Sequence, residues 1–428
     1  MPNFAKVLFK RYSVQSFFLS SPQIVAIFVS LLTLPIILSN LPIEDYGQFQ
    51  LILALQVWLS ALTADRISSG AKKGIARGQD GTFLYAFFIR IKFLLVIASI
   101  SLIVSFFVYN AGLGTLSILL IIMSGFLVLG YLPQVSYPEF FIAKKQFKSF
   151  AFWRIIAAIL IPIALAIVAF LTHNILIFAI VQLGMTAIIS LIAFFYVVLK
   201  NNLFSAYKRG EIDKTCSPYG IKLIPAAIIT VSANKITNFI IGFFFGFANL
   251  AVFSIASKLQ DKFSSFSKTP YNLFYSDFAR KDRGELIKKI KSKLRQGIAI
   301  SFLITFVFFL VGYFYIRLFL PESYQLAKIY FAILSLGLPV LILQMILHTI
   351  LEANLRYREL TVLIMLSNLI KIFLIILLGL LFGVIGVCWA IVLGAWLSFC
   401  FYYILTIRKD FVLKLMNKFS LLKKLSNF

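Results

Sequence analysis

The sequence predicts an all-α polytopic membrane protein, with about twelve transmembrane helices in two parallel six-helix lobes around a central cleft. Of its 428 residues, 61% are hydrophobic and only 13% are charged. Soluble domains carry roughly 25% charged and 45–50% apolar residues. Twelve helices of about 20 residues would take up roughly 240 residues. The remaining chain is long enough for short loops but too short for a folded extramembrane domain.

Apolar runs bounded by charged or turn residues place the twelve helices. The expected spans are 17–39, 46–64, 83–109, 115–137, 150–171, 175–199, 219–245, 249–275, 297–320, 325–351, 361–380 and 385–407. The first run is too long for the core of a signal peptide and lacks a small-residue cleavage site, so we expect it to remain as a span.

The basic residues orient these spans. With the N-terminus inside, the expected inner segments hold 32 of the 41 Lys and Arg residues, and the expected outer loops hold none. The only charges in the outer loops are Glu44, Asp45 and Glu322. This asymmetry predicts that both termini are cytoplasmic. The stretch 408–428 alternates apolar and basic residues, which predicts an amphipathic helix on the anionic inner surface.

The two halves of the chain resemble each other at an offset of about 203–210 residues. Pro22 matches Pro225, and Pro133 falls near Pro339. Two longer matches relate residues 45–56 to 249–260 and residues 143–148 to 353–358. Because each half has an even number of spans, the repeat is parallel, and such halves enclose a cleft and rock about it.

The repeat and the charge pattern define the expected domains. These are a six-helix lobe over 1–205, a cytoplasmic linker over 206–218, a second lobe over 219–407 and a basic tail over 408–428. Prolines within the spans are expected to kink them, and the matched pair Pro22 and Pro225 is the first candidate for gating.

Three lysines lie deep within expected spans: Lys235, Lys258 and Lys371. A cation at the centre of the bilayer costs on the order of 3 kcal/mol, and such groups usually face a protein interior or a watery cavity. We therefore expect these lysines to line a path that attracts anions. Snorkelling to the membrane surface and structural pairing remain open as alternatives, most clearly for Arg90 and Lys92 in the third span. Asp261, one turn from Lys258, is a candidate coupling residue.

The motifs of several protein classes are missing. There is no Walker A loop for ATP hydrolysis, and the three cysteines show neither a disulfide framework nor metal-ligand spacing. A net charge of +26 would suggest nucleic acid in a soluble protein, but here the charges flank membrane spans. We expect no catalysis, no metal, no cofactor and no nucleic-acid partner.

Four segments along the chain carry a family resemblance. The segment 41–49 reads Leu-Pro-Ile-Glu-Asp-Tyr-Gly-Gln-Phe, and the segments 238–259, 320–327 and 382–387 mark the entries to later helices. They resemble the Wzx-type O-antigen and polysaccharide flippases of the multidrug/oligosaccharidyl-lipid/polysaccharide (MOP) exporter superfamily, whose fold is the MATE-like pair of six-helix lobes.

The resemblance implies a bacterial inner-membrane flippase. Its cargo would be an oligosaccharide on undecaprenyl pyrophosphate, moved from the cytoplasmic to the periplasmic leaflet by alternating access. The pyrophosphate would be neutralised by Lys235, Lys258 and Lys371, with Arg90, Lys92 and Arg154 as further cations. Polar side chains for the sugar hydroxyls would be Gln23, Asn234 and Asn238. The resemblance further implies a proton or sodium counter-ion. It also implies contact with the polymerase and the chain-length regulator of the polysaccharide.

Other functions remain possible on the sequence alone. A drug exporter of the same superfamily usually needs carboxylates in its spans, and this chain has few. The lipid II flippase has two further helices. A surface-polysaccharide polymerase would need a large external loop, and a purely scaffolding role would not require cations in the spans.

Overall fold

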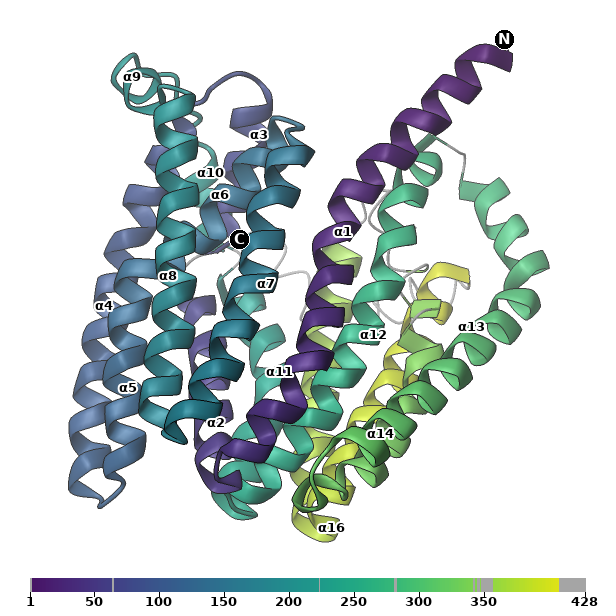
Figure 1. Cartoon of the computed structure of the whole chain (residues 1–428). Coiled ribbons are helices and arrows are strands. Elements are labelled where there is room, and N and C mark those ends of the chain that lie inside the picture. The colour runs from purple at the N-terminus through teal and green to yellow at the C-terminus, as the bar shows by residue number, and fades with distance from the viewer. Residues whose placement is uncertain are drawn as a thin grey trace, which may run out of the picture. The chain divides into compact units, whose positions relative to one another are not determined.

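The computed structural model describes residues 2–63, 65–222, 224–280, 283–341, 343–344, 347 and 357–407, and this part of the chain is helical without any strand (Figure 1). The predicted basic tail at 408–428 and the repeat match at 353–356 lie outside these residues. The all-α fold class predicted from the composition is confirmed.

The long helices follow the predicted spans. They are α1 (Pro2–Asn40), α2 (Ile43–Leu62), α4 (Thr82–Asn110), α5 (Gly114–Phe126), α6 (Leu132–Ala143), α7 (Phe147–Thr172), α8 (Ile175–Lys200), α11 (Ile224–Phe244), α12 (Phe247–Arg280), α13 (Arg283–Phe319) and α16 (Tyr357–Ile407). Shorter elements are α3 (Arg66–Ala76), η1 (Leu127–Tyr131), α9 (Leu203–Lys208), α10 (Cys216–Lys222), η2 (Glu322–Tyr324) and α14 (Ala327–Ser335). Within the described residues, eight segments are long and apolar enough to cross a membrane.

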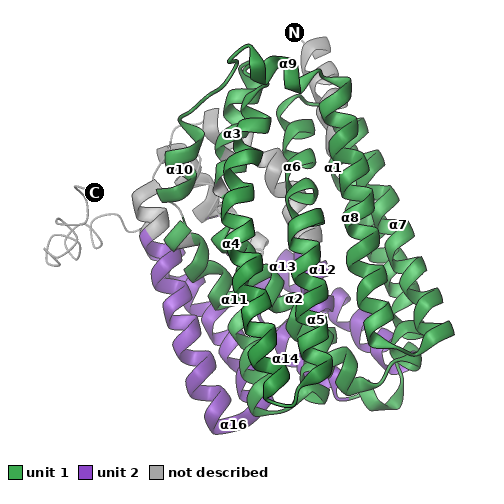
Figure 2. Cartoon of the chain, turned by 90° about the vertical axis from the view of Figure 1, so that its left-hand side faces the viewer, with its two compact units in different colours: residues 1–255, 319–325 green, residues 256–318, 326–428 purple. Residues whose placement is uncertain are grey.

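The chain divides into two compact units (Figure 2). Unit 1 comprises residues 1–255 and 319–325, and unit 2 comprises 256–318 and 326–428. The first helix of the second repeat, α11, therefore packs within unit 1, where Trp58 of α2 donates a hydrogen bond to Ser232 of α11 at 2.9 Å. The lobe boundary expected near residues 206–218 stays a prediction.

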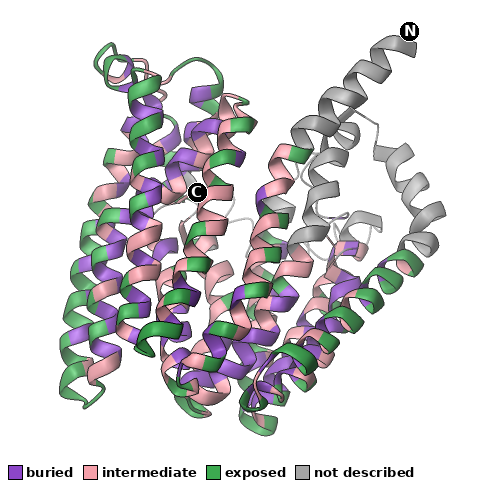
Figure 3. Ribbon diagram, in the orientation of Figure 1, coloured by how far each residue is buried: buried purple, intermediate pink, exposed green. Residues whose placement is uncertain are grey.

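Many large apolar side chains are exposed along the long helices (Figure 3). Phe106 and Phe107 of α4 are 63% and 65% exposed, and Leu171 of α7 is 68% exposed. A soluble monomer rarely exposes contiguous apolar patches larger than a few hundred Å². These surfaces face the hydrocarbon of a bilayer, and the protein is a multi-pass membrane protein.

Tight turns join successive helices. Between α7 and α8, His173 adopts a left-handed backbone (φ 50°), and the side chain of Asn174 accepts a hydrogen bond from the backbone N–H of Leu176 at 2.8 Å. That asparagine caps α8 in the way short polar residues usually do. Gly383 (φ 64°) divides α16 into the two spans predicted on either side of it; a left-handed φ of this kind favours glycine.

One end of unit 1 explains the Tyr-Gly motif of segment 41–49. The rings of Tyr46 and Tyr324, both buried, meet edge to face with centroids 6.5 Å apart. Gly47 contacts the backbone carbonyl of Phe247 so closely that a Cβ atom would overlap it. Glycine is needed here because two backbones touch.

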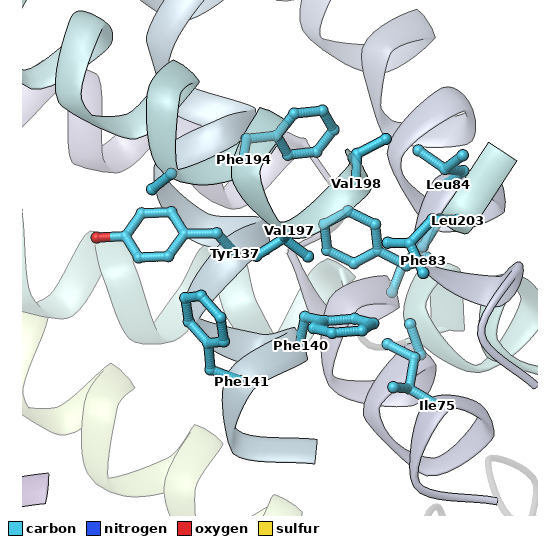
Figure 4. Packing of buried hydrophobic residues seen from close by; sticks show 14 of the residues in the cluster. Ile75, Phe83, Leu84, Tyr137, Phe140, Phe141, Phe194, Val197, Val198 and Leu203 are labelled. Carbon is cyan, nitrogen blue, oxygen red and sulfur yellow. The ribbon is translucent and has the colours of Figure 1, made fainter. Parts of the chain in front are cut away.

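The other end of unit 1 holds an aromatic core (Figure 4). The ring of Phe83 lies 5.4 Å from those of Phe140 and Phe194, so α4, α6 and α8 meet at one point. Ile67 and Ile75 of the short helix α3 are buried in the same cluster. This packing fixes α3 against the bundle, next to the charged cluster described below.

Two membrane helices are interrupted ahead of a proline. In the first half, the π-helix η1 separates α5 from α6 just before Pro133. In the second half, α14 ends at Ser335, residues 336–337 form a turn, and residues 338–341, which include Pro339, are helical again. The helices α1 and α7 also contain prolines but stay α-helical across them.

Candidate functional site

The most completely buried charge of unit 1 is Arg90 of α4, with 0% of its surface exposed. Its guanidinium donates to the backbone carbonyl of Thr63 at 3.3 Å and to the hydroxyl of Ser68 at 2.5 Å. It also forms an ion pair with Asp65. These partners lie in the bend between α2 and α3 and in the first turn of α3. Arg90 therefore ties that bend to α4.

Asp65 is the centre of this cluster. One of its carboxylate oxygens accepts a hydrogen bond from the hydroxyl of Tyr131 at 2.6 Å, and the other accepts one from the hydroxyl of Thr63 at 2.9 Å. Transferring a charged pair out of water costs several kcal/mol per ion unless hydrogen bonds compensate. Here the hydrogen bonds are made, so the cluster is a rigid charged joint between α2, α3, α4 and η1.

The sequence indicated Arg90 but missed the rest of the cluster. Asp65 lies beside Arg66 in the sequence, which suggested a local pair at a helix end. Its partner in the structure, Arg90, is 25 residues away, and Tyr131 is 66 residues away. Neither separation follows a local period. The only signal that could have found Tyr131 is the proline two residues after it. Whether Arg90 contacts a substrate stays a prediction.

Three of the predicted site residues lie around the middle of α11 in unit 1. Lys235 and Asn238 are half-buried, and Asn234 is exposed. Lys235 is nine residues from the end of α11 at Phe244, which is about 14 Å along the helix axis. The hydrocarbon core is about 30 Å thick, so Lys235 lies near its midplane if the helix end lies at the surface.

The predicted cations of unit 2 lie at similar depths in their helices. Lys258 is eleven residues into α12, or about 16 Å, and Lys371 is twelve residues from the kink at Gly383, or about 18 Å. Both are half-buried, whereas Asp261 is exposed. The side chain of Lys371 packs against Gly394, where a Cβ atom would lie 3.2 Å from its Cγ.

The remaining candidates lie in more varied surroundings. Lys92 and Gln23 are exposed, and exposed lysines on membrane helices can extend to the headgroups. Arg154 is also exposed, and it interacts with the hydroxyl of Tyr137. Of the matched prolines, Pro22 is buried in α1 and Pro225 is exposed near the start of α11. Their contacts with a substrate stay predictions.

The segment between α9 and α10 packs against the start of α4 in unit 1. The backbone N–H of Asp213 donates to the hydroxyl of Thr82 at 2.8 Å, and the Asp213 carboxylate accepts from the backbone and the hydroxyl of Thr215. These hydrogen bonds hold the pKa of Asp213 below its usual value. Burial raises the pKa of the adjacent Cys216 thiol to about 11, so at neutral pH this thiol is protonated. The linker is thus an ordered part of unit 1.

No group of three or more His, Cys, Asp or Glu side chains that could hold a metal ion occurs among the residues whose placement is described. What this part of the chain offers instead is a buried charged joint in unit 1, a lysine in α11, and two lysines in helices of unit 2. Such groups can bind anions and position helices.

Comparison with known sequences gives the family of the chain. The sequence model of a family of polysaccharide biosynthesis proteins matches residues 76–329, which is more than half of the chain. No curated protein sequence matches it.

Solved structures give the fold. An inward-facing multidrug resistance MATE family transporter of the MOP superfamily is 14% identical, with 94% of this chain and 99% of that chain covered and a TM-score of 0.68. A MOP superfamily transporter from Pyrococcus furiosus Vc1 (DSM3638) and a MATE in complex with MaL6 are each 14% identical, cover 94% and 96% of the two chains, and give TM-scores of 0.65. The MOP fold indicated by the sequence motifs is confirmed.

Proposed function

Because the chain belongs to the family of polysaccharide biosynthesis proteins, we propose that it is a flippase for a lipid-linked oligosaccharide. The match over residues 76–329 is the observation that carries the proposal. A polysaccharide pathway assembled on a membrane lipid needs a protein that moves the polar unit across the bilayer. A multi-pass protein with a transporter fold is suited to that step.

The proposed cargo is an oligosaccharide on undecaprenyl pyrophosphate, such as an O-antigen repeat unit. Its pyrophosphate is anionic, and Lys235, Lys258 and Lys371 lie in membrane helices at depths of about 14–18 Å from helix ends. We infer that these cations attract the pyrophosphate, because placing a cation in the hydrocarbon costs free energy and such residues usually have a function. Asn234, Asn238 and Gln23 supply amides for sugar hydroxyls.

The proposed cycle is alternating access, with the lipid tail remaining in the bilayer. The cargo enters from the cytoplasmic leaflet of the inner membrane and leaves to the periplasmic leaflet, with both termini cytoplasmic. The cycle would be driven by a proton or sodium gradient, with Asp261 as the coupling carboxylate, or by the membrane potential. The polymerase and the chain-length regulator are the proteins that would receive the product.

Drug export is the competing function, because MATE transporters share the fold. Exporters of organic cations need carboxylates in the membrane, where negative charge attracts the substrate. Among the candidate residues described above, the membrane helices carry the cations Arg90, Lys235, Lys258 and Lys371 and one carboxylate, Asp261. Charge therefore favours an anionic cargo over a cationic one.

The decisive experiment uses a strain lacking the gene. We expect surface polysaccharide to be lost and undecaprenyl-pyrophosphate oligosaccharide to accumulate on the inner leaflet, as measured by extraction and by its inaccessibility to periplasmic glycosidases. Single repeat units that still reach the surface would indicate a polymerase. Unchanged polysaccharide with increased drug sensitivity would overturn the proposal in favour of export.

Lysine variants test the cation contribution. Lys235→Ala and Lys258→Ala should each reduce flipping of fluorescent lipid-linked oligosaccharide in proteoliposomes by about tenfold or more, which corresponds to about 1.4 kcal/mol. Arginine at the same positions should retain more activity, since it keeps the charge. Lys200→Ala, at the exposed end of α8, is the control and should leave the rate unchanged.

A further inference from the structure

The interruptions of the two membrane helices carry similar short sequences, which differ by one inserted residue. Leu129–Pro133 reads Leu-Gly-Tyr-Leu-Pro, and Leu336–Pro339 reads Leu-Gly-Leu-Pro. The glycines are 207 residues apart and the prolines 206, within the offset of the internal repeat. In both copies the first leucine is exposed and the following residues are buried. The two interruptions are therefore equivalent positions in the two halves.

The proline explains why the helix is interrupted in each copy. Proline has no backbone N–H, so the carbonyls of Leu129 and Ser335 lose the donor four residues ahead. The first half responds with the π-helix η1, and the second with a turn at residues 336–337. Proline alone is not sufficient, because α7 remains α-helical across Pro162.

A polar side chain from a neighbouring segment of the same half holds each interruption. In unit 1, Asp65, in the turn between α2 and α3, accepts the hydrogen bond from the hydroxyl of Tyr131, the last residue of η1. In unit 2, the buried amide of Gln260 in α12 donates to the carbonyl of Leu334 at 3.1 Å, one turn before Gly337. The second hydrogen bond satisfies a backbone carbonyl at a helix break, and the first fixes the side chain of the break itself.

The glycine of each interruption faces the last helix of the same half. A Cβ atom on Gly130 would lie 2.7 Å from the Cβ of Ala187 in α8, and one on Gly337 would lie 3.8 Å from the Cα of Val392 in α16. Ala187 and Val392 are 205 residues apart, again at the repeat offset. Sequence motif, polar tie and packing partner thus recur together.

We propose that the two interruptions are matched hinges, one in each half, and that Tyr131 and Gln260 are the positioning residues that set their bend during transport. The proposal rests on the transport function inferred above. A helix with a complete hydrogen-bond ladder resists bending, whereas π-helical and proline-interrupted segments are the usual places where helices bend. Each hinge lies within a span and is held by a hydrogen bond to a neighbouring segment of its own half.

Restoring the missing donor tests the hinges. Pro133→Ala and Pro339→Ala each supply the absent N–H with a residue of high helix propensity. We expect both variants to fold at least as well as the wild type and to flip lipid-linked oligosaccharide about tenfold more slowly, with the half-saturating cargo concentration unchanged. That pattern means that a conformational step, rather than binding, is slowed. Pro162→Ala is the matched control and should keep the wild-type rate.

A second measurement does not depend on transport. Spin labels at the exposed Ile118 and Lys145 bracket the first interruption, and labels at Phe152 and Leu171 bracket the uninterrupted α7. We expect the first distance distribution in lipid nanodiscs to be broad or bimodal, to become narrow in Pro133→Ala, and to be narrow from the start in α7.

The outcomes separate the hinge from the function. If Pro133→Ala leaves both the distance distribution and the transport rate unchanged, the hinge is refuted. Equal slowing by Pro162→Ala would also refute it, because the effect would then belong to any intramembrane proline. If the wild type flips no lipid-linked oligosaccharide, the proposed function fails, and the distance distributions alone still decide whether the first interruption bends.

Discussion

The interruption at Leu129–Pro133 has one residue more between its glycine and its proline than the interruption at Leu336–Pro339. The first is a π-helix and the second a turn. A π-helix is what an α-helix forms when it accommodates an extra residue. The extra residue is Tyr131, and its hydroxyl is the group that Asp65 binds. Two copies of one motif have thus acquired different geometry through a single residue.

The two copies also differ in how strongly they are held. In the first, Asp65 accepts a hydrogen bond from Tyr131 and forms an ion pair with the buried Arg90. The second is held by one neutral hydrogen bond from Gln260. Removing Arg90 leaves the half-buried Asp65 carboxylate without its cation, whereas a neutral hydrogen bond contributes less. We therefore expect unit 1 to depend on its tie more than unit 2 does.

The largest effect should come from Arg90→Leu. Leaving the half-buried Asp65 carboxylate without its cation should lower the free energy of unfolding by about 3 kcal/mol, the lower end of the range for buried pairs, because water still reaches that carboxylate. Unfolding by denaturant in bicelles, followed by tryptophan fluorescence, measures it. Replacing Arg90 and Asp65 by Leu together with Tyr131→Phe removes both charges and the tyrosine hydroxyl at once. That triple variant should recover most of the loss, and a triple variant as unstable as Arg90→Leu would contradict our account of the ion pair.

The next effect distinguishes the two glycines. Gly130→Ala places a methyl group 2.7 Å from the Cβ of Ala187, so α8 must shift. Overpacking of this kind should cost about 1–3 kcal/mol of unfolding free energy. In Gly337→Ala, the atom nearest to the new Cβ is the carbonyl oxygen of Leu334, at 3.4 Å. This substitution should be tolerated with a change below about 1 kcal/mol, as compared in the same bicelle unfolding assay. Equal costs would show that the two packings do not differ.

The sequence predicted the coarse features of this molecule well. Hydrophobic runs and the placement of basic residues locate helices by composition alone, and the helices of the structure follow the expected spans. The proline pair 133 and 339 was also visible as part of the repeat. Composition and repeats suffice here because a membrane helix is defined by its length and its apolar surface.

The contacts between helices could not be predicted in the same way. The partners of Asp65 are 25 and 66 residues distant, and nothing in a single sequence relates their positions. The π-helix depends on one extra residue. In the comparison of the two halves, that residue changes only the sequence offset, from 207 at the glycines to 206 at the prolines. Deep lysines such as Lys235 were located in their helices, but what they contact across the bundle is a matter of packing rather than of pattern.

The smallest effect should come from the neutral tie in unit 2. Gln260→Leu removes one hydrogen bond to the carbonyl of Leu334 and should lower the free energy of unfolding by about 1 kcal/mol. Gln56 is the repeat equivalent of Gln260 in the first half and is half-buried in α2. Gln56→Leu is the matched control, and it should cost less because the tie of the first half comes from Asp65.

The ratio between the two ties is the quantity that tests the comparison. Measured in one bicelle unfolding series, Arg90→Leu should exceed Gln260→Leu by roughly threefold or more in free energy. If Gln260→Leu proved as costly as Arg90→Leu, the second interruption would depend on its amide as strongly as the first depends on its ion pair. The extra residue Tyr131 would then account for the difference in shape between the halves but not for any difference in how firmly they are held.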